Sequence, residues 1–250
     1  MRPIILGLGV LSVLSGGASF AQTPTFEVAS IRPSGPDTQR GGGFGMSPSG
    51  LFQVHGLSLA ELIQAAYSDG RPFYRFQLTG GPDWLDSARF DITASSTARN
   101  ATPAQTMAIV KAILMERFQL VVRAQTTEAP IYILTLASKD GSLGSRMRKS
   151  SLTCPGPGCD FKINPGTLTA RGLTTDRLAF SMANFSGLGR LIVDRTGLTG
   201  GYDMDMEWTP ASDDVSIFTA LREQLGLKLE SSRGPVPMLV IERAEKPSEN

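Results

Sequence analysis

The chain has 250 residues, of which 41% are hydrophobic and 19% charged, and its mean hydropathy is −0.03. This balance excludes an intrinsically disordered chain and a polytopic membrane protein, and the length fits one large or two small domains. Lysine and arginine number 24 against 23 aspartates and glutamates. Without a basic surplus, we expect neither nucleic-acid binding nor charge-driven binding to an anionic membrane.

Residues 1–21 have the pattern of a secretory signal peptide. Arg2 is followed by an apolar run from Ile4 to Leu14 and then by small residues that end at Ala21. This run is too short to cross a bilayer as a helix. We therefore expect cleavage after Ala21 and a mature protein that is periplasmic or secreted and does not span the membrane.

Residues 22–50 are predicted to form an N-terminal strand and a glycine-rich connection. The strand covers 26–31 and ends at Pro33, and the run 40–50 has the composition of a flexible loop. The loop lacks the Gly-Lys-Ser/Thr ending of a phosphate-binding loop. No cofactor is expected from it.

From residue 51 to the C-terminus the sequence is an approximate duplication. Three blocks recur in the same order, and they pair 51–58 with 167–174, 89–92 with 201–204, and 114–120 with 221–227. Such self-similarity indicates one structural unit that occurs twice. We predict two tandem modules, 51–137 and 167–250.

Each module is predicted to run strand, helix, strand, strand, helix, strand, strand. Its first helix spans 59–67 in one copy and 175–185 in the other, and Ser58 and Glu61 have the spacing of a capping box. Two helices on one face of a small mixed sheet, present twice, make an α+β fold.

The second helix of the first module has a cap at Thr102, proline at position 103 and Gln105 at the third helical position. Apolar residues lie on one face of the second helix in each copy: Ile109, Ile113, Leu114 and Phe118 in the first, and Ile217, Leu221 and Leu225 in the other. Two separate strands are predicted to follow in each module, 119–123 and 131–137 in the first and 228–231 and 238–243 in the second.

Residues 138–166 are rich in lysine and arginine and are predicted to be a basic linker between the modules. Cys154 and Cys159 are the only cysteines and enclose a Pro-Gly-Pro-Gly stretch, which favours a local disulfide in an oxidising compartment. Because the chain has a single histidine, a zinc site would need carboxylates to complete its ligands, and no metal site is expected.

Blocks across most of the mature chain resemble a family of secreted bacterial proteins of unknown function, described as soil-associated and present in many copies per genome. The matching blocks are 26–33, 80–91, 194–203, 207–210, 221–230 and 240–250. That family has no assigned catalytic or binding residues. Relatives are fused to membrane metallopeptidases of the beta-lactam-sensor type, so the resemblance implies an extracytoplasmic sensing or interaction role.

The repeat unit also resembles, more weakly, the short N-terminal domain of secretins and TonB-dependent receptors. The segment from Leu198 to Ile241 has the same succession of a glycine-rich turn, a strand, a helix that ends in Leu-Gly-Leu and a terminal strand pair. That resemblance implies protein contacts in the periplasm.

The chain offers a single imidazole for catalysis. A Ser-His-Asp or Cys-His site needs a histidine between nucleophile and carboxylate, and His55 aligns with Arg171 of the second module. Two polar residues of different chemistry at equivalent positions indicate a solvated strand position. We predict no catalytic residue.

Three carboxylates alternate along one predicted strand. Asp203, Asp205 and Glu207 are separated by apolar residues, a pattern typical of a half-buried strand with an acidic solvated side. The alternatives are a site for a basic partner or a cation, and a carboxylate-dependent hydrolase. The intervening residues Tyr202, Met204, Met206 and Trp208 are predicted to be buried.

Four aromatic residues cluster around the loop after the first helix of the first module: Tyr67, Phe73, Tyr74 and Trp84. They are either core residues or a candidate ligand surface on which glycan rings would stack. The leading hypothesis is a non-enzymatic interaction or sensing module that recruits an envelope protein at exposed strand edges. The alternatives are a glycan- or cell-wall-binding module and, less favoured, the hydrolase.

Overall fold

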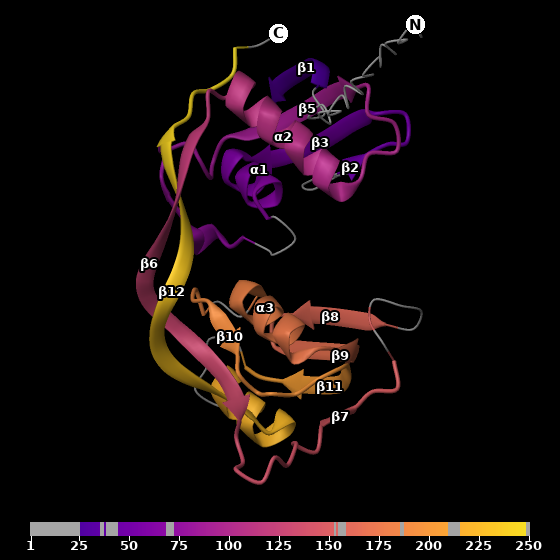
Figure 1. Ribbon diagram of the computed structural model, residues 1–250, viewed down its shortest axis with the longest axis vertical. Coiled ribbons are helices and arrows are strands. Elements are labelled where there is room, and N and C mark those ends of the chain that lie inside the picture. Colours follow the sequence, from indigo (N-terminus) through magenta and orange to yellow (C-terminus); the bar gives the residue numbers. More distant parts are fainter. Residues whose placement is uncertain are drawn as a thin grey trace, which may run out of the picture.

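The fold is mixed α+β, with two halves joined by a long two-stranded ribbon (Figure 1). The computed structural model describes residues 26–35, 38, 45–68, 73–152, 154, 159–185, 188–209 and 216–248. The predicted signal peptide and residues 40–44 of the glycine-rich run lie outside the described residues, whereas residues 45 and 46 of that run form a short strand.

The first half is a four-stranded sheet with two helices packed on one face (Figure 1). Its strand order is β1-β5-β3-β2, and all neighbours are antiparallel. The bounds are β1 Phe26–Pro33, β2 Gly45–Met46, β3 Leu51–Ser58, β5 Arg89–Ser96, α1 Leu59–Ala66 and α2 Pro103–Arg117.

The helix caps of the first half are those predicted from the sequence. The Ser58 hydroxyl accepts the N–H of Glu61, and the Glu61 carboxylate accepts the N–H of Ser58 in return. Thr102 and Gln105 form the same reciprocal pair at the start of α2. Each box satisfies two backbone donors that the first helical turn leaves without intrahelical partners. The predicted apolar face of α2 is fully buried.

The second half has a sheet with the strand order β7-β11-β9-β8, again with antiparallel neighbours. The bounds are β7 Met147–Lys149, β8 Asp160–Asn164, β9 Thr167–Leu173, β11 Tyr202–Glu207, α3 Thr175–Phe185 and α4 Ile217–Ala220, which continues directly into the π-helical turn η2 Leu221–Leu225. The predicted basic linker 138–166 therefore contributes two strands, β7 and β8. Hydrogen bonding to β11 and β9 outweighs the loop-like composition of that segment.

The ribbon consists of β6 (Val121–Leu136) and β12 (Leu227–Arg243), which pair antiparallel along their whole length. Two short strands are added to it in parallel: β4 (Leu78–Gly80), preceded by the 3₁₀ turn η1 (Arg75–Gln77), pairs with β12, and β10 (Ile192–Asp194) pairs with β6. Leu239 near the end of β12 belongs to the core of the first half, and Leu134 near the end of β6 belongs to that of the second. Each half is thus completed by a strand end from the other part of the chain.

The proline of β6 does not interrupt the hydrogen bonding of the ribbon. The N–H of Tyr132 donates to the carbonyl of Leu191, 2.8 Å away, so Tyr132 directs its backbone groups away from β12. The direction of the backbone N–H and C=O groups alternates along a strand. The even-numbered residues of β6 therefore point these groups away from β12, toward the outer edge of the ribbon. Pro130 is one of them, and the N–H that it lacks is not needed by the β6–β12 ladder.

The prolines of β12 lie in the same way. The carbonyl of Pro237 accepts the side-chain amide of Gln77 at 2.7 Å, so the odd-numbered residues of β12, including Pro235 and Pro237, face outward. The sequence predicts two separate strands at the C-terminal end of each module. That interruption is wrong, because all three prolines occupy positions where a continuous ladder tolerates them.

Candidate functional site

The predicted acidic row lies on the outer face of β11. The alternate residues Tyr202, Met204, Met206 and Trp208 are buried, as predicted. The three carboxylates each face an arginine: Asp203 pairs with Arg148 at 3.0 Å, Asp205 with Arg171 at 3.1 Å and Glu207 with Arg146 at 3.4 Å. The row is therefore a ladder of compensated charges rather than a negative patch.

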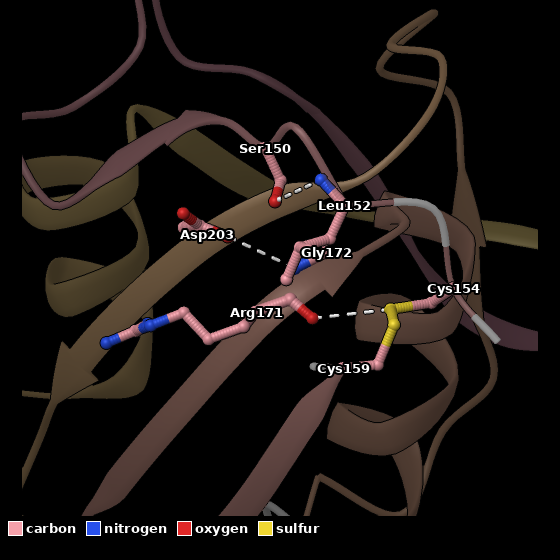
Figure 2. The surroundings of a disulfide bond; sticks show 7 residues. All are labelled: Ser150, Leu152, Cys154, Cys159, Arg171, Gly172 and Asp203. Carbon is pink, nitrogen blue, oxygen red and sulfur yellow. Dashed lines mark hydrogen bonds between the residues drawn. A yellow bond between two sulfur atoms is a disulfide. The ribbon is translucent and has the colours of Figure 1, made fainter. Parts of the chain in front are cut away.

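Asp203 differs from its two neighbours because it bonds to the backbone. Its side chain is only 15% exposed, against 50% for Asp205. The carboxylate accepts the N–H of Gly172 at 3.1 Å, and Figure 2 shows it lying beside that glycine. The hydroxyl of Ser150, this N–H and Arg148 all bond to the ionised form, and together they hold the pKa of Asp203 below its ordinary value.

Gly172 is the second residue of a β-bulge. Arg171 and Gly172 of β9 lie opposite Asp203 alone, because Tyr202 pairs with Leu173 and Met204 with Ala170. Gly172 has φ +73°, a left-handed conformation that favours glycine. We call the pair formed by this glycine N–H and the opposing aspartate the bulge clamp.

The disulfide packs directly behind this bulge (Figure 2). Cys154 and Cys159 are joined, and the Cys154 sulfur lies 3.3 Å from the carbonyl oxygen of Arg171. A Cβ on Gly172 would stand 2.8 Å from that sulfur and 3.0 Å from the Cβ of Leu152. The disulfide therefore belongs to the scaffold that shapes the bulge.

The first half contains the same clamp, and His55 is part of it. His55 and Gly56 lie opposite Asp91, since Val54 pairs with Ile92 and Leu57 with Phe90. Asp91 accepts the N–H of Gly56 at 2.9 Å and the hydroxyl of Ser34 at 2.6 Å. His55 is 46% exposed, with Nδ1 3.8 Å from Asp91. Its carboxylate neighbour already serves the backbone, which leaves His55 at a solvated strand position.

Sequence reasoning missed the clamps, although the duplication contains their signal. Gly56 aligns with Gly172, and Asp91 aligns with Asp203. A glycine and an aspartate that recur together, some thirty residues apart in both copies, point to a backbone contact rather than to a surface row.

The four aromatic residues do not form one surface. Tyr74 is 4% exposed and inserts into the core of the second half, where its hydroxyl donates to the carbonyl of Phe180 at 3.1 Å and its ring stacks on Phe76. Burial, followed by the charge of Asp176, raises the pKa of Tyr74. Trp84 packs edge-on against Phe90 in the core of the first half. The predicted ligand surface is thus divided between two cores.

Tyr67 and Phe73 remain together and line a cavity of about 410 Å³ beside the ribbon. The ribbon contributes the rest of the lining: Ala124, Gln125 and Thr126 from β6 and Pro237, Met238 and Leu239 from β12. The Lys111 ammonium lies over the Tyr67 ring at 4.7 Å. None of the described residues that line this cavity is charged, so they are suited to an apolar group rather than to an ion.

Within the described part of the chain, no three histidine, cysteine or carboxylate side chains are grouped closely enough to hold a metal ion. The same residues include no helix of sufficient length and apolarity to cross a membrane.

Comparison with known families gives one match. The model of the family described as protein of unknown function, DUF3738, matches residues 60–244. The chain belongs to the DUF3738 family. The DUF3738 region runs from α1 to the end of β12 and therefore includes the ribbon, the cavity and the bulge clamp of the second half. Neither the curated proteins nor the solved structures give a significant match.

Proposed function

We propose that the protein is an extracytoplasmic, non-enzymatic module that binds another polypeptide chain at its ribbon. The observation that carries the proposal is the exposure of the ribbon between the two halves: every residue from Arg123 to Glu128 of β6 is exposed. A long strand with uncovered backbone groups is a template for a further strand, and soluble proteins usually cover or shorten such edges.

The surroundings of the titratable groups support a binding role. Asp203 and Asp91 serve backbone N–H groups, and Asp205 and Glu207 face arginines. A general acid or base needs a group that is free to exchange a proton with a substrate. Carboxylates committed to the scaffold in this way favour binding over catalysis.

The proposal includes the duplication. The sheets of the two halves, β1-β5-β3-β2 and β7-β11-β9-β8, have the same strand order when β1, β2, β3 and β5 are matched with β7, β8, β9 and β11. A bulge clamp occupies the same place in both sheets. Two copies of one module joined through their last strands account for both facts. The leader at residues 1–21 and the disulfide are the features that suggest an extracytoplasmic location.

Site-specific photo-crosslinking in a native envelope extract tests this function. A photoreactive amino acid replaces Gln125, which is exposed on the ribbon, and in a matched variant it replaces Glu116, which is exposed on α2. We expect one protein to be captured reproducibly from position 125 and not from position 116. Equal capture from both positions, or no protein from either, refutes a binding role for the ribbon.

A further inference from the structure

We infer that the outer edge of β6 receives the partner as one added strand, an extended peptide segment that pairs with residues 124–128 and places an apolar side chain in the adjacent cavity. This inference rests on the proposed function and specifies how the partner is held.

The outer edge of β6 offers three backbone N–H groups to an added strand. Ala124, Thr126 and Glu128 are the even-numbered, outward residues of the exposed stretch, and each retains its N–H. Among the described strands, β10 alone pairs with this side of β6, and this pairing begins only at Tyr132 of β6. One of the outward carbonyls, that of Glu128, accepts the Arg233 guanidinium at 3.0 Å. The other two outward residues have no such contact among the hydrogen bonds of the described chain.

The other long edges offer less to a partner. On β12, Pro235 and Pro237 lack the N–H that an added strand needs, and Gln77 occupies the carbonyl of Pro237. The outward residues of β1 include Ala29 and Ile31, each only 2% exposed, so their backbone groups are covered. The edge strand β8 has only five residues. Of these edges, β6 is the one whose free outward N–H groups belong to residues that line the apolar cavity, and we therefore choose it for the new strand.

The boundaries of the edge fix the length of the segment. Pro130 ends the run of outward donors, and β10 occupies the edge beyond it. At about 3.4 Å per residue, the stretch from Ala124 to Glu128 spans roughly 14 Å, enough for a peptide of about five to seven residues.

The cavity gives the segment a side-chain preference. Ala124 and Thr126 belong both to the free edge and to the cavity lining, together with Tyr67 and Phe73. Neighbouring residues of paired strands place their side chains on the same face of a sheet. A partner residue that pairs beside Ala124 or Thr126 therefore directs its side chain over the cavity, whose lining selects an apolar one.

Peptide selection on the full mature chain provides the probe. Linear peptides of about twelve residues, roughly twice the length of the edge, are displayed and selected for binding. Ala124→Pro and Thr126→Pro then each remove one outward N–H and leave the β6–β12 ladder intact, as Pro130 already does. The matched control is Ser231→Pro, since Ser231 is the outward residue of β12 that the duplication aligns with Ala124.

We expect each β6 variant to weaken the selected peptide about tenfold or more and the control to leave its affinity unchanged. Unchanged affinity in both β6 variants, or an equal loss in the control, overturns the inference. If position 125 still crosslinks a partner in that case, the proposed function stands without the added strand. Absence of both crosslinking and peptide binding refutes the two together.

Residue-resolved amide hydrogen exchange on the unsubstituted chain provides a test that does not depend on variant folding. Strand addition protects the outward amides of Ala124, Thr126 and Glu128 on peptide binding, whereas the inward amides of Gln125 and Thr127 already pair with β12 and change little. Uniform protection, or protection of the inward amides alone, overturns the inference.

Discussion

Replacement of Asp203 with alanine tests the role of the carboxylate in the bulge clamp. The substitution leaves the N–H of Gly172 without its acceptor at 3.1 Å and removes the hydrogen bond from Ser150. A buried donor left unsatisfied costs about 1–3 kcal/mol, so we expect the free energy of unfolding to fall by about 2 kcal/mol in urea titrations at neutral pH.

The matched control is Asp205→Ala. Asp205 is half-exposed and its partner Arg171 is partly solvated, so loss of this ion pair costs about 0–1 kcal/mol. A destabilisation by Asp205→Ala as large as that by Asp203→Ala would contradict the distinction between the bulge clamp and the exposed ion pairs of the acidic row. So would an effect of Asp203→Ala below about 0.5 kcal/mol, a size typical of neutral surface changes.

The destabilisation caused by Asp203→Ala is expected to depend on pH. The pKa of Asp203 lies below its ordinary value of 3.8 in the folded chain, so the ionised form is the one that folding stabilises. Its contribution is fully present above that ordinary value and is lost as the pH falls through the folded pKa. The difference in unfolding free energy between the unsubstituted chain and Asp203→Ala therefore narrows in acid, and a difference that widens there would refute the assignment.

Three further substitutions probe the scaffold around the site. Gly172→Ala forces a left-handed residue against the disulfide and is expected to cost about 1–3 kcal/mol by thermal unfolding, whereas a neutral result would mean that the bulge relaxes freely. Replacement of both Cys154 and Cys159 with serine removes a disulfide that closes a very short loop. It should lower the free energy of unfolding by about 2 kcal/mol at most, measured by urea titration against the unsubstituted chain with and without reductant. Thr102→Ala removes the α2 cap and is expected to cost about 1 kcal/mol, with a cost near zero counting against the capping box.

Local features of the fold could be predicted because their causes are local. The capping boxes at Ser58 and Thr102 involve residues three positions apart, and the buried face of α2 follows from helical spacing. The alternation along β11 likewise identifies its buried side. In each case the sequence pattern and its structural cause lie within one element.

Long-range pairing accounts for what could not be predicted. The prolines of the ribbon suggest strand ends, and only the identity of the partner strand shows that they point away from the ladder. Tyr74 follows α1 in the sequence but is buried beside Phe180, in a core formed by the other half. The sequence pattern places the acidic row on the solvated side of its strand. Its arginine partners, however, come from β7, from β9 and from the turn that precedes β7.

The pairing of β4 with β12 also constrains the order in which the molecule folds. Leu78 of the first half hydrogen-bonds alongside Leu239, near the end of the chain, and Leu239 and Ile241 complete the first core. A ribosome that has made the whole first half has therefore not yet supplied the strand that closes it. Such high contact order slows folding and keeps the chain open until its last elements emerge. The first half therefore reaches its full stability only after the last strand of the chain has been made.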